Sequence, residues 1–308
     1  MKQEDCSSFR PFSFYRKSLP FPMVICTNCG GEFPSRSKLF KHLPTCLHET
    51  NKDGGSEDED GVVEVDEDGV VEVVEREPGF FQVVVKPQGM PTMGGRTASG
   101  LSMQNHPALV IEEKRVTEQS HLWKVVRAVP VHRLDSATGG LLICAESTIA
   151  EQSLRCAFRE RLVHKRYRAV VVGLVEQDVG TITLALSGQD SRTEYKVVSR
   201  TPCTLFGGGL TTLDLFPVTG RRHQLRRHLA AISHTIVGDF RYRGSIIWPA
   251  SVRRLYLWAC EVSFPHPATW PGGDSSMVCT TARMVTVTTE EPPFYKQLLD
   301  SATAAGVV

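Results

Sequence analysis

The stretch from His132 to Gly140 holds an aspartate in a setting that suits catalysis. Asp135 follows His132 and Arg133 closely and lies in a turn of small residues between two apolar runs. A carboxylate that is both partly buried and charge-paired can act as a nucleophile or as a base. A loop aspartate with a purely structural role has the same local sequence, so the other motifs of the chain must decide.

Two further motifs supply groups that could complete a site for an anionic substrate. Tyr167 lies in the segment 165–170, at the head of a predicted strand, where it would present an aromatic hydroxyl. The segment 219–229 predicts a helix that begins after a glycine and carries four arginines. Helix N-termini and clustered guanidinium groups bind anions, and Arg226 could pair with a carboxylate through two hydrogen bonds.

A third motif, near the N-terminus, has the spacing of metal ligands. Cys26 and Cys29 are separated by two residues, and 12 residues later come His42 and then Cys46. Thiolate and imidazole are the ligands that a tetrahedral Zn²⁺ takes in proteins. We therefore expect one structural Zn²⁺ bound by Cys26, Cys29, His42 and Cys46.

The small apolar core of a ββα zinc finger has counterparts in the same segment, at Phe33 and Leu39. The segment resembles such a finger, of Cys-Cys-His-Cys type, with Cys46 in place of the usual second histidine. His48 is the alternative fourth ligand, because its spacing from the first histidine is also allowed. One finger covers only about three base pairs, so it would dock RNA or a protein partner, or serve only to position the next segment.

The charge of the chain is unevenly distributed. Residues 49–77 hold 13 of the 34 acidic residues and only two basic ones, which leaves 33 basic residues against 21 acidic ones elsewhere. A basic surplus suits a polyanionic partner such as nucleic acid. Within the acidic segment the sequence 60–65 recurs at 68–73. We expect a disordered linker here, the alternative being that its valines pair with an exposed sheet edge.

Strand-like segments dominate the rest of the chain. They lie at 80–85, 141–145, 167–172, 181–186, 194–198 and 210–216, and a helix is expected after Ser147, with Leu154 on its apolar side. This order predicts an α+β domain built on a largely antiparallel mixed sheet. No apolar run approaches the roughly 20 residues that span a bilayer, so we expect no membrane association.

These blocks, in this order, resemble the RluA-type family of RNA pseudouridine synthases. The resemblance covers about residues 80–267 and includes the Lys86-Pro87-x-Gly89 turn, the motif 132–135, and the strand 254–257 followed by His266-Pro267. It implies a synthase catalytic domain and an isomerisation that needs no cofactor. The N1–C1′ bond of a uridine breaks, the base turns, and C5 bonds to C1′.

The resemblance also implies roles for particular residues. Asp135 would be the catalytic residue, either as a nucleophile or in removing a sugar proton. Tyr167 would stack near the target base and take part in proton transfer, and Arg226 would pair with the catalytic aspartate. The residues expected to contact substrate are His132, Arg133, Lys165, Arg221, Arg222, His223 and Gln224.

The chain departs from the family pattern at four places without losing any of these groups. The family usually has Thr-Ser-Gly at 138–140, Thr at 222, His-Pro at 234–235 and His at 258, where this chain has Thr138-Gly139-Gly140, Arg222, His234-Thr235 and Trp258. These differences concern the shape of the pocket and the identity of the RNA.

The sequence therefore predicts five parts: a disordered N-terminus (1–23), a zinc finger (24–48), an acidic linker (49–77), a catalytic domain (78–300) and a tail (301–308). The expected function is pseudouridine synthesis in structured RNA, rRNA or tRNA, by a monomer; a protein partner for the finger or the linker is left open. The alternative is a non-catalytic RNA-binding or assembly protein with the synthase fold. Nine irregularly spaced cysteines favour a reducing, intracellular location, in cytoplasm or nucleus, with mitochondrion or plastid left open.

Overall fold

The structure is a computed structural model that describes residues 24–25, 32–33, 71–93, 102–117, 120–204, 206–270 and 282–306. The chain forms two compact units, residues 1–58 and 59–308. In the first unit, β1 (Val24–Ile25) and β2 (Glu32–Phe33) pair as antiparallel strands. The four predicted zinc ligands, and the acidic linker up to residue 70, lie outside the described residues. No helix in the described part of the chain is both long and apolar enough to cross a membrane.

The second unit is built on one large sheet. Its strands follow the order β10-β11-β12-β9-β13-β8-β4-β3, with β14 added to β13 and β7 added to β8. All of these strand pairs are antiparallel except β8 with β13. The predicted α+β class with a mixed, mostly antiparallel sheet is therefore confirmed. The strand bounds are β3 Val73–Glu77, β4 Phe81–Lys86, β7 Val129–Pro130, β8 Gly139–Ala145, β9 His164–Val172, β10 Val179–Thr183, β11 Arg192–Pro202, β12 Gly209–Pro217, β13 Leu257–Pro265 and β14 Met284–Thr288.

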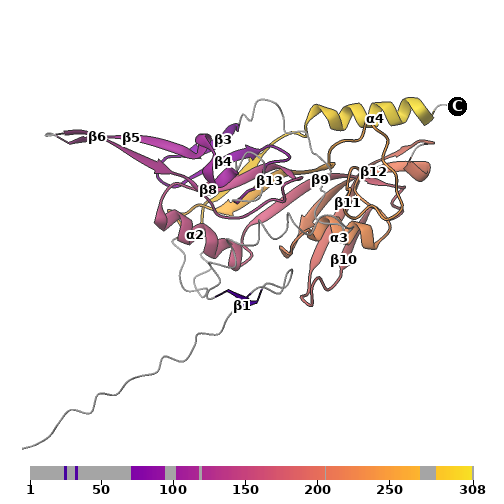
Figure 1. Ribbon diagram of the computed structural model, residues 1–308, viewed down its shortest axis with the longest axis horizontal. Helices are drawn as coiled ribbons and strands as arrows, with labels where there is room; N and C mark the ends of the chain where they lie inside the picture. The colour runs from indigo at the N-terminus through magenta and orange to yellow at the C-terminus, as the bar shows by residue number, and fades with distance from the viewer. Residues whose placement is uncertain are drawn as a thin grey trace, which may run out of the picture. The chain divides into compact units, whose positions relative to one another are not determined.

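Three helices of the described residues pack on this sheet (Figure 1). α2 (Thr148–Arg159) packs on β8 and β13, and α3 (Gln224–Ala231) packs on β10, β11 and β12. α4 (Pro293–Gly306) contacts β11 and β12 and lies along the upper edge in Figure 1, on the other side from α2 and α3. The predicted cap of α2 is confirmed, because the Ser147 hydroxyl accepts a hydrogen bond from the Ala150 amide at 3.3 Å. Short 3₁₀ turns occupy Met103–Asn105, Pro107–Leu109 and Phe206–Gly208.

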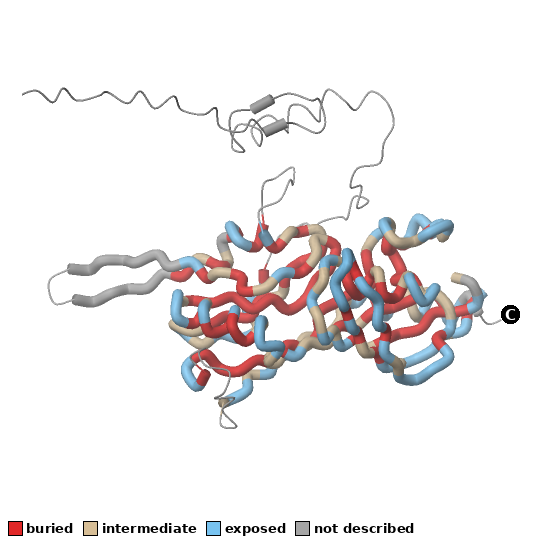
Figure 2. The backbone as a smooth tube through the Cα atoms, turned by 90° about the horizontal axis from the view of Figure 1, so that it is seen from below, coloured by how far each residue is buried: buried red, intermediate tan, exposed pale blue. Residues whose placement is uncertain are grey.

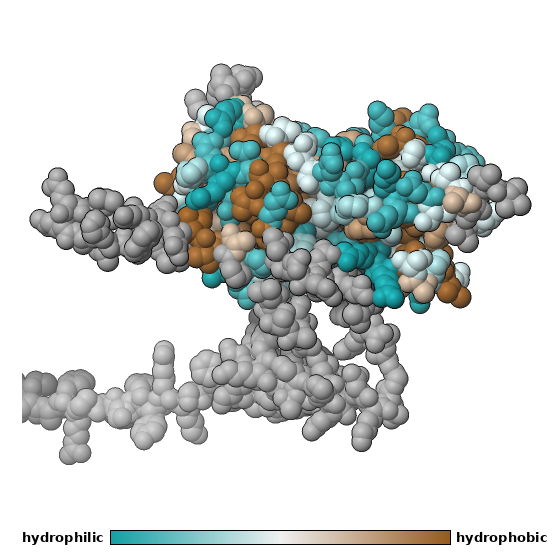
Figure 3. Space-filling view, turned by 90° about the horizontal axis from the view of Figure 1, so that it is seen from above, coloured by the Kyte–Doolittle hydropathy of each residue, from teal (hydrophilic) through white to brown (hydrophobic). Residues whose placement is uncertain are grey.

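Figure 2 shows that buried residues run through the middle of the second unit. The central strand β8 is buried along its whole length, and alternate residues enter different cores. Leu142 belongs to the larger core, which also takes in residues of α3 and α4. Leu141 and Ile143 belong to a second core with Leu154 of α2. Because neighbouring strand residues point to opposite faces, a strand covered on both faces must be apolar throughout. On the face shown in Figure 3, hydrophobic residues gather over the half that carries β3 and β4, and hydrophilic ones cover much of the half that carries α4.

The structure corrects two predicted boundaries. The linker was expected to extend to residue 77, but Val73–Glu77 forms the edge strand β3, paired with β4, and Val71 is buried. Val73, the last residue of the second repeat, is the one residue of that repeat in β3, where it lies opposite Val84 at the edge of the sheet. The tail predicted at 301–308 was also wrong over most of its length, because α4 continues to Gly306.

A long hairpin was not predicted from the sequence. β5 (Val110–Thr117) and β6 (Ser120–Arg127) pair with each other as a separate two-stranded sheet. The hairpin projects from the second unit in Figure 1. Its charged and apolar residues do not alternate regularly, which explains why the pattern did not indicate a strand pair.

Two departures from the family pattern are in direct contact. Gly139 of β8 lies opposite Trp258 in the parallel register with β13. A Cβ atom at Gly139 would lie 2.2 Å from Cζ3 of Trp258 and 2.9 Å from Cγ of Gln88. Glycine at 139, where the family usually has serine, therefore makes room for the indole at 258, where the family usually has histidine.

We predict that Gly139→Ser lowers the free energy of unfolding by about 1–3 kcal/mol, because the added atoms overpack a buried contact. Trp258→His should relieve that cost, so the double variant should lose less stability than the sum of the two single variants. Urea unfolding of the four proteins measures this coupling. Strictly additive losses would show that the two positions do not compensate each other.

Candidate active site

One pocket of about 450 Å³ gathers the residues singled out in the sequence. It lies between the loop that precedes β8, the first residues of β9 and the loop that leads from β12 into α3. All ten predicted catalytic and substrate-contacting residues line it: Asp135, Tyr167, Arg226, His132, Arg133, Lys165, Arg221, Arg222, His223 and Gln224. The tertiary structure thus joins three motifs that are spread over residues 132–229.

The loop that carries Asp135 is hydrogen-bonded to the Lys86-Pro87-Gln88-Gly89 turn. The Gly89 amide donates to the Ser136 carbonyl at 2.9 Å, and the Ser136 hydroxyl donates to the Gly89 carbonyl at 2.8 Å. The side-chain amide of Gln88 donates to the Ala137 carbonyl at 3.0 Å. The loop also closes on itself, since the Thr138 amide donates to the Asp135 carbonyl at 3.0 Å. Backbone hydrogen bonds therefore fix the position of Asp135.

Lys86 is the buried cation of this clamp. Its ammonium group donates to the carbonyls of Pro87, Met90 and Ser136 at 2.8, 2.7 and 3.1 Å. Burial lowers the pKa of Lys86 to about 7, and the nearby negative charge of Asp135 opposes that shift. A protonated lysine has three donors and no acceptor. In that form all three are used within the protein, and Lys86 positions the loop without facing the substrate.

Tyr167 enters the pocket from the middle of β9, between Leu215 of β12 and Ala259 of β13. Its side chain is buried, and burial together with the charge of Asp135 raises the pKa of its phenol. The hydroxyl therefore keeps its proton at neutral pH. Tyr167 can donate a hydrogen bond to a base in the pocket or pass a proton on.

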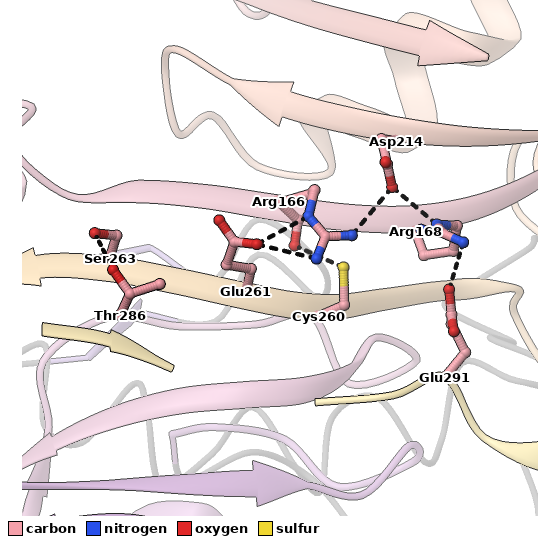
Figure 4. A network of polar contacts seen from close by, with 8 residues as sticks. All are labelled: Arg166, Arg168, Asp214, Cys260, Glu261, Ser263, Thr286 and Glu291. Atoms are coloured by element: carbon pink, nitrogen blue, oxygen red, sulfur yellow. Dashed lines mark hydrogen bonds and ion pairs between the residues drawn. The ribbon is translucent and has the colours of Figure 1, made fainter. Parts of the chain in front are cut away.

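The two neighbours of Tyr167 point to the other face of the sheet and form an ion-pair network (Figure 4). Arg166 lies directly opposite Glu261 and pairs with it at 3.0 Å, and it also reaches Asp214 at 3.3 Å. Arg168 lies directly opposite Asp214 and pairs with it at 2.8 Å. Because cross-strand charge pairs stabilise a register, this network holds β9 between β12 and β13 and so fixes Tyr167.

The structure changes the interpretation of His132. Its Nε2 accepts a hydrogen bond from the Ile143 amide at 3.0 Å, and its ring stacks on Phe158 with centroids 4.8 Å apart. Burial, aided by the charge of Lys165, lowers the pKa of His132 to about 3. His132 is therefore a neutral ring that braces the loop and lines the pocket.

Gln224 lines the pocket, and its side-chain amide is engaged within the protein. Its carbonyl oxygen accepts from the Thr219 hydroxyl at 2.7 Å and from the Arg221 amide at 3.0 Å. Its amide nitrogen donates to the Arg192 carbonyl and the Thr193 hydroxyl, both at 3.0 Å. A glutamine amide has two donors and two acceptor sites, and here all four are used. Gln224 therefore ties the loop before α3 to β11.

Arg226 has a carboxylate partner that the sequence analysis did not foresee. Its Nε and Nη2 donate to the two carboxylate oxygens of Asp239 at 2.7 and 2.8 Å, and both side chains are almost completely buried. The guanidinium also lies over the Tyr242 ring, 5.2 Å from its centroid. Arg226 was expected to pair with Asp135, but these two hydrogen bonds go to Asp239. Any interaction with Asp135 comes in addition to that pair.

His223 approaches the Asp135 carboxylate most closely among the histidines that line the pocket. Its Nε2 lies 3.8 Å from Oδ1 of Asp135, and its Nδ1 is 3.0 Å from the Tyr242 hydroxyl. Burial lowers the pKa of His223, and the surrounding arginines lower it further, although Asp135 acts in the opposite direction. At neutral pH the ring is therefore uncharged, and it can donate through Nε2 toward the carboxylate when Nδ1 accepts from Tyr242.

Comparison with known proteins agrees with this geometry. The model of the RNA pseudouridylate synthase family matches residues 81–231. The dual-specificity RNA pseudouridine synthase RluA of Vibrio vulnificus is 37% identical over 199 residues, covering 60% of this chain and 74% of that protein. The protein of the same name from Escherichia coli K12 is 32% identical over 202 residues, covering 60% and 83%. The chain belongs to the RluA family of RNA pseudouridine synthases.

A solved structure shows that the fold is shared more widely. Human RNA pseudouridylate synthase domain containing 1 superposes with a TM-score of 0.51 at 22% identity, over 77% of this chain and 96% of that chain. Family membership makes the protein an isomerase, and it favours catalysis over the alternative of a non-catalytic RNA-binding protein.

Several pocket residues of the synthase were not identified from its sequence. Phe158, Thr138 and Leu257 line the pocket beside the predicted residues. Thr138 is the threonine of the family pattern, which could have indicated it, whereas Phe158 lies on α2, outside all the motifs. Of the departures from the family pattern, Arg222 lines the pocket, and His234 instead contacts the Val172 carbonyl at 2.9 Å.

We predict that Arg226→Ala destabilises the synthase by about 3–5 kcal/mol, because it leaves the buried Asp239 carboxylate without its counter-charge. Thermal and urea unfolding measure the loss. The double variant Arg226→Ala/Asp239→Asn should recover part of it, since no charge is then left unpaired. A variant that keeps its stability and loses only activity would show that Arg226 acts on the reacting groups alone.

Proposed function

We propose that the synthase acts on unpaired or flipped uridines of structured RNA, rRNA or tRNA, with Asp135 as the catalytic group. The observation that carries this proposal is the composition of the pocket. Among the described residues that line it, Asp135 is the sole carboxylate, and it is surrounded by arginines and a lysine. The relatives named dual-specificity synthases favour more than one class of RNA as substrate.

The size and polarity of the pocket suit a single extruded nucleoside. Ligand pockets of about 300–1,000 Å³ are typical for small molecules, and this one measures about 450 Å³. A uridine inside a helix must leave its stack to enter such a pocket. Arg133, Arg222 and Lys165 would then face its phosphates, and the apolar rings would face its base.

The pocket supplies what the isomerisation requires from the protein. The uracil leaves C1′ through N1, turns, and bonds through C5, so C5 loses a proton and N1 gains one, and no atoms enter or leave overall. Asp135 is proposed to act at the sugar, as a nucleophile or in removing a proton. Tyr167, which keeps its phenolic proton, is proposed to hydrogen-bond to the base and to exchange protons with it. Pseudouridine synthases carry out this reaction without a cofactor.

We predict that Asp135→Asn abolishes turnover while RNA affinity and thermal stability stay near those of the wild type, because the change keeps the shape and removes the ionisable group. Mapping pseudouridine in total RNA with and without the protein measures the activity and identifies the target together. Retained isomerisation by the variant would rule out Asp135 as the catalytic group.

We also propose that the first unit is a zinc finger with ligands Cys26, Cys29, His42 and Cys46, His48 being the alternative to Cys46. The paired strands β1 and β2 support this proposal, since they flank Cys26 and Cys29 in the chain as the hairpin of a ββα finger would. Binding of RNA or a protein partner by this unit, the monomeric state and the intracellular location stay predictions.

We predict one equivalent of zinc per chain, released by Cys26→Ser or by chelation. Because the finger and the catalytic unit are separate compact units, this variant should isomerise a short RNA at the wild-type rate. Metal analysis and a turnover assay measure the two effects. A metal-free native protein, or a catalytic unit that unfolds when zinc is removed, would contradict the proposal.

A further inference from the structure

A second hollow adjoins the active-site pocket. It measures about 720 Å³ and lies between the C-terminal end of α2, the start of β9 and the end of β12. We refer to it as the side groove. It shares Phe158, Lys165 and Pro217 with the active-site pocket, as well as the loop residues 219–221. A chain that enters one hollow can therefore continue into the other.

The charge of the side groove is positive. Arg159, Arg161, Lys165 and Arg221 line it, against a single carboxylate, that of Glu194. That carboxylate is paired with Arg192 at 2.6 Å. The groove therefore offers cations to a polyanion that leaves the active-site pocket.

Arg161 occupies a backbone position that normally selects glycine. It follows the C-terminus of α2 with a φ of 59°. The Leu162 amide donates to the Ala157 carbonyl at 2.9 Å, and the Arg161 amide donates to the Phe158 carbonyl at 3.3 Å. These two hydrogen bonds form a Schellman motif with Arg161 in its left-handed position, where glycine avoids a steric cost. An arginine at this position adds a steric cost that glycine would avoid, so the fold alone does not explain why arginine is there.

Phe216 gives the side groove an accessible aromatic surface. It lies on β12 opposite Glu194 of β11, and it is 37% exposed, although most of β12 is buried. Proteins that bind single-stranded nucleic acid combine exposed aromatic rings with basic groups, because the bases stack on the rings and the cations bind the phosphate backbone.

We infer that the side groove binds a nucleotide adjacent to the target uridine, with its base on Phe216 and its phosphate held by Arg161 and Arg221. This inference rests on the proposed function, because it takes the active-site pocket to hold the target uridine. The two hollows together accept two neighbouring unstacked nucleotides. The enzyme therefore selects uridines whose neighbour is also free of a helix.

Phe216 is tested with the full-length protein and a fluorescein-labelled seven-residue oligouridylate. Phe216→Ser should weaken binding about fivefold or more, since stacking of one base is worth about 1–3 kcal/mol. An oligonucleotide with abasic sites on both sides of a central uridine should bind wild type equally weakly, and the variant should bind it no worse than wild type does. Ile247→Ser is the control, because Ile247 is 87% exposed and does not line the side groove. The inference would be overturned if Phe216→Ser weakened binding of the abasic oligonucleotide as much as it weakens binding of the oligouridylate. It would also be overturned if the variant bound the oligouridylate as tightly as wild type does.

Arg161 is tested through the salt dependence of the same binding. Arg161→Gly should reduce the slope of log K against log salt by about 0.7, the value for one phosphate contact of a single strand. The melting temperature should stay the same or rise, because glycine fits the left-handed position. Lys196→Gln removes one charge from an exposed residue of β11 outside the side groove and should leave the slope unchanged. Equal slopes for wild type and Arg161→Gly would overturn the inference.

Mapping of pseudouridine in total RNA separates this inference from the proposed function. If wild type, Phe216→Ser and Arg161→Gly all modify the same uridines with equal kcat/KM, the proposed function stands and the side groove has no role. If wild type modifies no uridine, the proposed function fails, whatever the binding data show. The expected result is a raised KM for both variants with kcat little changed, because neither residue lines the active-site pocket.

Discussion

The active site depends on a buried lysine that holds a loop by its backbone. The Lys86 ammonium group binds three carbonyls, one of them that of Ser136, the residue directly after Asp135. Because carbonyl groups are present in every residue, this clamp fixes the path of the loop without constraining its side chains, and the Asp135 carboxylate stays directed into the pocket. The lysine stands near that carboxylate, which offsets part of the cost of burying it.

Strand β9 likewise carries both a residue that faces the substrate and residues that hold it in place. Tyr167 faces the pocket, and its neighbours Arg166 and Arg168 form ion pairs on the opposite face. The alternation of a strand thus puts the reactive group and its anchors on consecutive residues. On the other side of β13, the close approach of β8 depends on glycine: at Gly140 the φ is 109° and a Cβ would lie 2.3 Å from the Ala259 carbonyl oxygen.

The electrostatics of the site differ from what its residue types suggest. His132 and His223 are both uncharged at neutral pH, because burial and neighbouring cations disfavour the imidazolium form. The positive charge that faces a substrate therefore comes from arginine and lysine. Arg226, which looks like a partner for Asp135 in the sequence, is engaged by the buried Asp239. A buried ion pair of this kind anchors the start of α3 and with it the loop of residues 219–223.

The sequence by itself determined the fold class, the family and ten of the residues that line the pocket, because turn residues, strand patterns and the order of the motifs can be read without coordinates. It did not determine which groups are already satisfied within the protein. Four features arise only when the fold brings segments together: the full use of Gln224, the neutral His132, the Asp239 partner of Arg226 and the fit of Trp258 over Gly139. Strand β3 was decided in the same way, since the end of the acidic segment becomes a strand only where a neighbouring sheet leaves an edge unpaired. Hydrogen-bond saturation, burial and edge pairing are properties of neighbours in space, and only the tertiary structure supplies those neighbours.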